Sequence, residues 1–267
     1  MADIDPMASS IDLYLFHMKR LREKASLSQE ALGARVGYTG KFIGLVETKK
    51  RRPNTKLSIA MDNLYDMPKF FEAVLPRIAE EAGLPPGFWE YVEEEGRASQ
   101  IRIYGQFIVP GLLQNEDYAR EVMRAGKRPK YLEELVRTRM DRKEVFSREE
   151  PPNVITVLEE GALRKIVGSQ EITRRQLEQL VTYCHEPNFA IYVLAHSAQM
   201  FPEGSFTVLS FPSEPNAGYE ESVGGRGRLI EAGTAVTELA VGFELIREKA
   251  LQAEASEALI RQILEAM

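Results

Sequence analysis

Apolar residues in the N-terminal part of the chain recur every three or four positions, which places them on one face of an α-helix. This spacing predicts a helix over 11–25 and two shorter helices over 29–36 and 40–47. Ser28 and Thr39 precede the two short segments and are residue types that cap helix N-termini. Two short helices joined by a turn that contains glycine are typical of a helix-turn-helix unit.

Prolines and composition divide the chain beyond this unit. Pro53 interrupts the helical pattern, and two more apolar helices follow, so a mainly α N-terminal domain of about five helices is expected. The second of these helices leads into an acidic stretch that contains the only tryptophan. The predicted parts are a disordered leader over 1–10, a helix-turn-helix domain over 11–67, a helical connector over 68–100 and a regulatory or partner-binding domain over 101–267.

Helical patterns alternate beyond residue 100 with short runs of β-branched and aromatic residues. Such runs predict strands over 153–158, 189–194 and 205–210. The glycine-rich segment 223–229 lacks a G-x-G-x-x-G spacing and is interpreted as a flexible turn, and the tail from Arg228 is expected to be helical. Few, late strands among many helices predict a helix-rich α+β domain with a small sheet.

The charge is divided unevenly along the chain. The whole sequence carries a net charge of -6, but residues 19–56 hold eleven Lys or Arg against three Glu. That segment is therefore +8 and the remainder is -14. A small basic module on a large acidic body is typical of a protein in which one part meets a polyanion such as nucleic acid.

The predicted helix over 40–47 has the size of a probe for the major groove of double-stranded DNA, which is about 12 Å wide. Ile43 and Val46 face the core, so the opposite side is free to meet base edges. Gln29, at the start of the preceding helix, is positioned to contact a phosphate. The expected base-facing residues are Thr39, Gly40, Lys41, Phe42 and Leu45.

A basic run follows the probe helix. If five cations met phosphates, the logarithm of the binding constant would fall against the logarithm of salt concentration with a slope of about -4.5. The alternative interpretations are a solvated loop for the run and a plain three-helix packing unit for the helices. The expected phosphate contacts are Lys49, Lys50, Arg51, Arg52 and Lys56.

The sequence LREKASLSQEALGARVGYTGKFIGLVETKKRRP resembles the lambda-repressor/Cro-like fold of the xenobiotic-response-element regulators, over about residues 12–66. The resemblance implies a partly buried structural ion pair between Arg22 and Glu47. Gly33, Gly44 and Leu45 depart from the family's usual residues. Leu45 cannot hydrogen-bond a base, so these departures bear on sequence specificity more than on DNA binding.

The C-terminal part is similar to the regulatory domain of actinobacterial antitoxin-like regulators. The segments IYGQFIVPGLLQNEDYAREVMRAG, VITVLEEGALRKIVG and ITRRQLEQLVTYCHEPNFAIYVL carry the likeness, with VPGLLQ followed by DYAR as its most specific element. The resemblance implies an actinobacterial source and a small protein partner encoded nearby. VPGLLQ itself is interpreted as a packed helix entry, with direct ligand contact as the alternative.

Enzyme chemistry finds little support in the residues. The chain has one cysteine, Cys184, and three histidines, and it lacks HExxH, GxSxG and Walker-type sequences. Cys184 and His185 are neighbours on a helix, and adjacent helical residues do not face each other. No enzyme activity, metal or cofactor is expected. The other histidines are His17 and His196.

The preferred interpretation is therefore a cytoplasmic, nucleoid-associated transcription regulator with no membrane segment. It would act as a homodimer on double-stranded DNA, with half-sites about 34 Å apart or at a multiple of that distance. An antitoxin-like interaction protein that sequesters a small partner, with weak or vestigial DNA binding, is the alternative.

Overall fold

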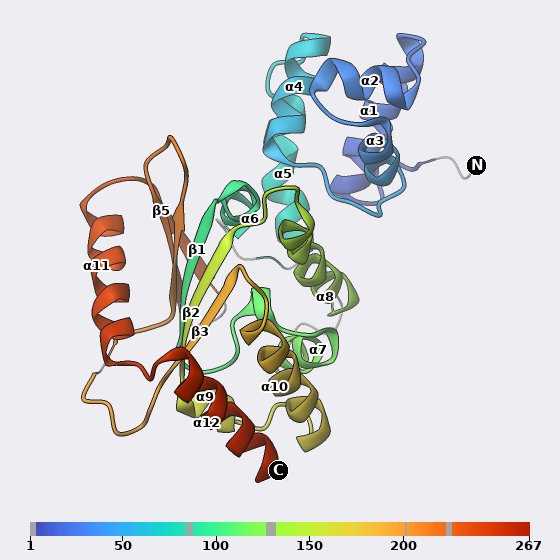
Figure 1. The fold of residues 1–267 in the computed structure, drawn as a ribbon. Helices are drawn as coiled ribbons and strands as arrows, with labels where there is room; N and C mark the ends of the chain where they lie inside the picture. Colours follow the sequence, from blue (N-terminus) through green and yellow to red (C-terminus); the bar gives the residue numbers. More distant parts are fainter. Residues whose placement is uncertain (1–3, 83, 85–87, 127–131, 201, 223–225) are drawn as a thin grey trace. The chain divides into compact units, whose positions relative to one another are not determined.

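The computed structural model describes residues 4–82, 84, 88–126, 132–200, 202–222 and 226–267, and the chain forms two compact units, Met1–Trp89 and Glu90–Met267 (Figure 1). None of the described helices is long and apolar enough to cross a membrane.

All regular secondary structure among the described residues of the first unit is helical. Its core collects buried apolar side chains from five helices, among them Leu15, Leu32, Ile43, Leu57 and Phe71. The helices are α1 (Ser10–Lys24), α2 (Gln29–Val36), α3 (Gly40–Glu47), α4 (Thr55–Tyr65) and α5 (Phe70–Glu81). A sixth helix, α6 (Phe88–Arg97), begins at the boundary of the two units.

The ends of the first unit differ from the predicted divisions. Ser9 caps α1, since its side chain accepts a hydrogen bond from the backbone N–H of Asp12, so the last residues of the expected leader are structured. Phe71, Val74 and Ile78 of α5 lie in the same core as α1 to α4. The first part of the predicted connector is thus an integral part of the N-terminal unit.

The second unit contains a six-stranded mixed sheet with the strand order β3-β2-β1-β4-β5-β6. The first three strands run parallel to one another, and the last three continue the sheet in antiparallel pairs. The strands are β1 (Gln100–Gly105), β2 (Asn153–Glu159), β3 (Phe189–Leu194), β4 (Phe206–Ser210), β5 (Ala217–Ser222) and β6 (Arg226–Ile230).

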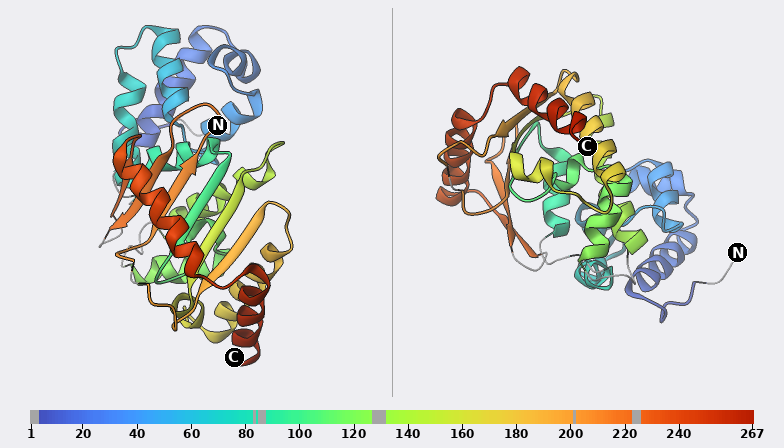
Figure 2. Two further views of the ribbon diagram at one scale, coloured as in Figure 1. Left: turned by 60° about the vertical axis from the view of Figure 1, so that its left-hand side comes forward. Right: turned by 90° about the horizontal axis from the view of Figure 1, so that it is seen from below.

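Helices flank the sheet on both sides. Val236, Phe243 and Ile246 of α11 pack on one face in a cluster with Tyr104 and Val208, and the left view of Figure 2 shows α11 crossing the strands. Figures 1 and 2 show α8 and α10 on the other side. The helical elements are η1 (Gly111–Leu113), α7 (Glu116–Ala125), α8 (Leu132–Asp141), η3 (Arg142–Ser147), α9 (Glu160–Arg164), α10 (Gln170–Cys184), α11 (Thr234–Lys249) and α12 (Ala253–Glu265).

The sheet is larger than the three predicted strands. β2, β3 and β4 coincide with them, whereas β1, β5 and β6 were not predicted. The expectation of a helix from Arg228 is wrong, because 226–230 pair with β5 and α11 begins only at Thr234. Residues 223–225 of the segment interpreted as a flexible turn lie outside the described residues. β5 and β6 carry mostly small or charged residues, and their strand character comes from pairing at the sheet edge.

Candidate nucleic-acid interface

The turn between α2 and α3 is set by local chemistry. Ser28 and Thr39 cap the two helices through hydrogen bonds from the backbone N–H groups of Ala31 and Phe42. Gly37 ends α2 in the left-handed conformation with φ of 77°. A Cβ at Gly33 would lie 2.6 Å from the carbonyl oxygen of the turn residue Tyr38, so glycine is what lets the turn pack this closely on α2.

One side of α3 is buried, and the other is accessible. Ile43 and Val46 are fully buried in the core of the first unit. Thr39 and Lys41 are exposed, and Phe42 and Leu45 are half-buried. The N-terminal end of α3 therefore presents a hydroxyl, an ammonium group and two apolar side chains at an accessible surface.

Gly40 has a different role from the outward-facing one expected of it. A Cβ at Gly40 would lie 2.8 Å from the Cα of Glu30 and 2.9 Å from its backbone nitrogen. The position of a side chain at Gly40 thus faces α2, and the residue permits close packing of the two helices. Gly40 can therefore contact a ligand only through its backbone.

An aromatic pair extends the accessible surface. The rings of Tyr38 and Phe42 stack with centroids 4.3 Å apart and an interplanar angle of 16°. The Arg51 guanidinium carbon lies 5.1 Å from the centre of the Phe42 ring, and the Lys56 ammonium lies 5.9 Å from that of Tyr38. Sequence analysis missed Tyr38 because it lies in the turn, although a second aromatic four residues later was a usable signal.

The basic residues after α3 do not all remain available for phosphate. The Lys49 ammonium lies 2.6 Å from the Oδ1 atom of Asp12, and Arg52 donates a hydrogen bond of 3.1 Å to the backbone carbonyl of Ile78. These two side chains tie the segment to α1 and α5. Lys41 and Lys50, in contrast, are exposed and form no ion pair within the described part of the chain.

The Lys49 contact also changes the acid chemistry of its partner. Burial raises the pKa of Asp12, but hydrogen bonds from Lys49 and Ser9 and the positive charge of Lys49 outweigh this effect. The net pKa of Asp12 is below its usual 3.8.

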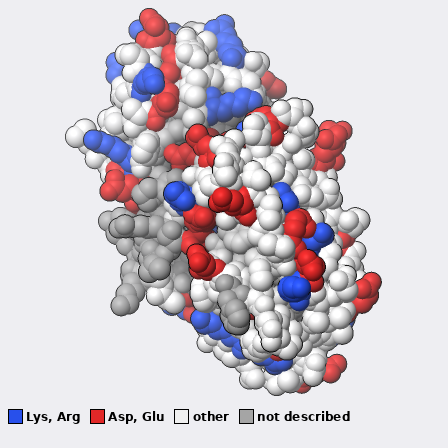
Figure 3. All heavy atoms as spheres, turned by 90° about the vertical axis from the view of Figure 1, so that its left-hand side faces the viewer, with Lys and Arg blue, Asp and Glu red and all other residues white. Residues whose placement is uncertain are grey.

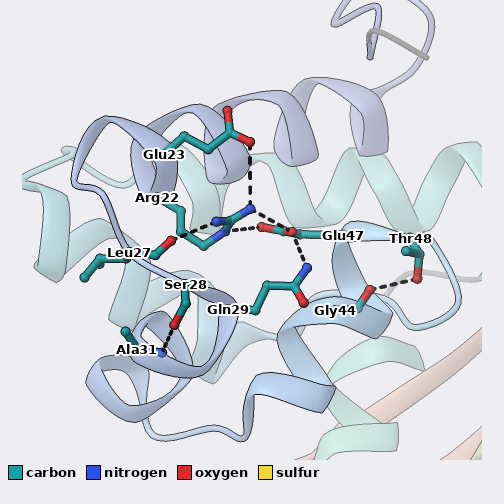
Figure 4. A network of polar contacts seen from close by, with 9 residues as sticks. All are labelled: Arg22, Glu23, Leu27, Ser28, Gln29, Ala31, Gly44, Glu47 and Thr48. Atoms are coloured by element: carbon teal, nitrogen blue, oxygen red, sulfur yellow. Dashed lines mark hydrogen bonds and ion pairs between the residues drawn. The ribbon is translucent and has the colours of Figure 1, made fainter. Parts of the chain in front are cut away.

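A polar network joins α1, α2 and α3 behind the accessible surface (Figure 4). Arg22 and Glu47 form a two-pronged ion pair, with Nε 2.7 Å from Oε1 and Nη2 3.1 Å from Oε2. The two side chains are only 12% and 6% exposed. Arg22 also donates to the carbonyl of Leu27 at 2.8 Å. The network fixes the end of α3 to the end of α1.

Gln29 belongs to this network. Its Nε2 atom donates to the Oε2 atom of Glu47 at 2.7 Å, although the residue was expected to contact a phosphate. A Cβ at Gly44 would lie 2.9 Å from the Oε1 atom of Gln29, so the glycine provides the space for this contact. Glycine at this position of α3 thus has a packing role that its low helix propensity alone does not reveal.

The second unit matches a known protein family. The family model for the Domain of unknown function (DUF5753) matches residues 88–262. The chain belongs to the DUF5753 family. The DUF5753 match starts at the first residue of α6 and ends within α12, and it leaves out α1 to α5. No curated protein matches the chain.

The VPGLLQ segment of the DUF5753 domain is held by buried amides. Gln114 is fully buried, and its Nε2 atom donates to the carbonyl of Val109 at 2.7 Å. Gln176 of α10 is also fully buried and donates to the carbonyl of Leu113 at 2.9 Å while its Oε1 accepts from the backbone of Asn115. These hydrogen bonds fix the entry into α7 and agree with the packing role that the sequence suggests.

The structure shows the surroundings of the cysteine and the three histidines. Burial raises the pKa of the Cys184 thiol to about 11, which disfavours the reactive thiolate. His185 pairs with Glu257 of α12 at 3.2 Å. His196 lies beside Glu160, and His17 lies against the rings of Phe16 and Phe70.

Proposed function

We propose that the chain is a DNA-binding transcription regulator in which α2, the turn and α3 act as a helix-turn-helix. The main support is the arrangement of α3, whose apolar side is buried while its capped N-terminus carries the exposed Lys41. The DUF5753 unit would mediate dimerisation and respond to a small protein partner or ligand. The proposal includes no catalytic step and no cofactor, and its setting is the nucleoid in the cytoplasm.

The proposed contacts follow from what the accessible side of α3 offers. Thr39 and Lys41 can hydrogen-bond base edges or phosphates, and Phe42 and Leu45 can pack on a thymine methyl group. Backbone N–H groups at the helix N-terminus favour an anion. This division assigns sequence preference to α3 and general affinity to the cations that follow it.

The intramolecular contacts of Lys49 and Arg52 lower the expected salt dependence. If Lys49 and Arg52 keep these contacts on binding, at most three of the five cations predicted to meet phosphate would do so. Three phosphate contacts correspond to a slope of about -2.7 in the logarithm of the binding constant against the logarithm of salt concentration. A slope of about -4.5 would mean that Lys49 and Arg52 leave their partners on binding.

The deciding experiment is genome-wide footprinting followed by titration of the best duplex with three variants. Lys41→Ala should change the ranking of sites, because Lys41 lies at the tip of α3. Lys50→Ala should weaken all sites alike and reduce the salt slope by about 0.9. Lys165→Ala removes an exposed cation from the second unit and serves as the matched control with unchanged binding.

Two outcomes would overturn this proposal. One is the absence of duplex retention by the wild-type protein even in dilute salt. The other is an equal effect of Lys165→Ala and Lys50→Ala, which would indicate nonspecific attraction by surface charge and no defined interface.

The proposed dimer partner of the DUF5753 unit is a second copy, packed through antiparallel α11 helices. Val241 and Leu245 are 55% and 51% exposed on this helix, and a Cβ at Gly242 would meet nothing within 4 Å. Antiparallel pairing that sets Leu245 of one copy over Gly242 of the other also sets Glu238 opposite Lys249. In this pairing the apolar side chains of the two copies meet, and so do the opposite charges.

The surface around α11 is consistent with a dimer contact confined to this helix. Figure 3 shows the side of the molecule that carries α11, where acidic and basic side chains are scattered among uncharged ones. Leu245→Glu should shift sedimentation of the protein toward the monomer. Glu238→Lys should weaken the dimer and Lys249→Glu should restore it in the double variant, since the pair would be reversed. Failure of this restoration would contradict the antiparallel pairing.

An antiparallel dimer would present two copies of α3 to one operator. The half-sites should then lie about 34 Å, or a multiple of that distance, apart. A footprint with half-sites at unrelated spacings would contradict a symmetric dimer on DNA.

A second candidate function is sequestration of a small protein partner with weak DNA binding. It is favoured by the engagement of Lys49 and Arg52 within the unit and by Leu45, which cannot hydrogen-bond a base. Capture of a partner from the native host, combined with the absence of any protected operator, would support it over the first proposal.

A further inference from the structure

Arg139 of α8 is a partly buried cation that forms no ion pair among the described residues. Its Nη1 atom donates to the neutral amide oxygen of Gln114 at 2.8 Å. Its Nε atom is buried and has no hydrogen-bond partner. Among the described residues, no carboxylate oxygen lies within ion-pair distance of this guanidinium.

The neighbouring carboxylates Glu221 and Glu95 offset the charge of Arg139 only through longer-range interactions, without an ion pair. Arg142 lies close enough to oppose its charge, and Glu95, the most buried carboxylate nearby, is already engaged. Glu95 accepts hydrogen bonds from Arg142 at 2.8 and 2.6 Å and from the hydroxyl of Tyr91 at 2.6 Å. Burial and the charge of Arg142 lower the pKa of Arg139 to about 10.

The chain makes room for the guanidinium. A Cβ at Gly111 would lie 3.0 Å from the central guanidinium carbon of Arg139 and 3.0 Å from its Nη1 atom. Gly111 is the glycine of the VPGLLQ segment, so this segment supplies both the space for Arg139 and, through Gln114, its one hydrogen-bond acceptor. Arg139 as a whole residue is partly exposed, so solvent reaches part of it.

Aromatic residues lie near the same cluster. The rings of Tyr91 and Tyr219 stack with centroids 4.0 Å apart, and the guanidinium carbon of Arg142 lies 5.3 Å from the centre of the Tyr91 ring. Both tyrosines interact electrostatically with Arg139. The surroundings of Arg139 therefore combine a second cation, a neutral amide and two buried aromatic rings.

We propose that Arg139 is the anchor of a binding site for a small oxyanion, in which a carboxylate or phosphate group displaces the atoms that cover the Nε edge of the guanidinium and bonds to that edge. Gln114 holds the opposite edge and fixes the plane of the group. A planar fork with parallel N–H donors matches two oxygens of one anion, which a lysine would not do. The site lies in the DUF5753 unit and is independent of DNA binding.

The test uses the full chain and two probes, sodium benzoate and inorganic phosphate, which distinguish a carboxylate from a phosphate ligand. Titration by calorimetry and by the rise in melting temperature should show saturable binding of at least one probe. Arg139→Gln should weaken that binding at least tenfold, and Arg139→Lys should also weaken it, because the ammonium lacks the fork.

Two controls keep the outcome specific. Arg97→Gln removes the same charge from an exposed ion pair of the same unit and should leave binding unchanged. The Nε–H resonance of Arg139, identified by its loss in Arg139→Gln, should shift on titration. Absence of saturable binding, or equal binding by Arg139→Gln in a folded protein, would overturn the proposal.

Discussion

The two units each contain a buried arginine network, and the networks differ in how completely they are satisfied. In the first unit, Arg22 meets both oxygens of Glu47 and the carbonyl of Leu27. In the second unit, Arg142 and Glu95 form an equally close pair, but Arg139 beside them has only the amide oxygen of Gln114. A closed network holds helices together, whereas an open one retains binding capacity for an anion.

The largest effect is expected from the pair in the second unit. Glu95 and Arg142 are 2% and 6% exposed, so Glu95→Gln would remove the buried carboxylate that pairs with Arg142 and that also acts on Arg139 at longer range. We expect a loss of about 3–5 kcal/mol in the free energy of unfolding of this unit. Urea denaturation followed by circular dichroism measures it.

Glu94→Gln on the same helix is the matched control for this variant. Glu94 pairs with Arg97 at the surface, where an ion pair contributes at most about 1 kcal/mol. Similar losses in the two variants would contradict the distinction between buried and exposed pairs in this unit.

A smaller loss is expected in the first unit. Glu47→Gln breaks the ion pair, but Arg22 keeps its hydrogen bond to Leu27 and lies 3.9 Å from Glu23, which partly compensates its charge. Loss of the hydrogen bonds to a charged group should cost about 1.5–3 kcal/mol. Denaturation should place this variant between wild type and Glu95→Gln, and the reverse order would mean that the first network is the more tightly coupled.

The same contrast explains what could be predicted from sequence. Caps and periodicity are local, so Ser28, Thr39 and the buried Ile43 and Val46 indicated α2 and α3 at their observed positions. The approach of Arg22 to Glu47 was implied by family resemblance, since the pair spans two helices of one short motif.

The second network could not be predicted in this way. Glu95, Arg139 and Arg142 come from α6, α8 and η3, and nothing in their spacing indicates that they meet. The central strand β1 was missed for a related reason. Its short run gains strand character from β2 and β4, which follow more than fifty and one hundred residues later in the chain.

Substitution of one glycine beside each network tests whether the side chains of that network can move. Gly111 and Gly44 both leave space for a polar side chain, Arg139 in one case and Gln29 in the other. Gly111→Ala would press on a buried guanidinium and should cost about 1–3 kcal/mol. Gly44→Ala meets the end of an exposed glutamine that can move, so the gain in helix propensity of about 0.5–1 kcal/mol should offset the lost contact.

Thermal unfolding of the two alanine variants measures this difference. Gly44→Ala should melt at or above the wild-type temperature, and Gly111→Ala should melt below it. Equal destabilisation would show that Gln29 is as firmly held as Arg139, and the two networks would then not differ in rigidity.

The smallest effect concerns Asp12 and Lys49, a pair at the edge of the first unit. The pKa of Asp12 is lowered in the folded state, so its contribution to stability is present above pH 3.8 and is lost as the pH falls through and below that value. Because Lys49 is 50% exposed, the contribution should be within about 1 kcal/mol.

Lys49→Gln should therefore flatten the acid limb of the stability profile slightly and leave stability above pH 5 lower by no more than that amount, as measured by urea denaturation between about pH 2 and pH 7. Ser9 still donates a hydrogen bond to Asp12 in this variant, so part of the acid dependence should persist. A larger loss would mean that the basic segment after α3 is held as firmly as the buried pairs, and Lys49 would then be unavailable to a phosphate.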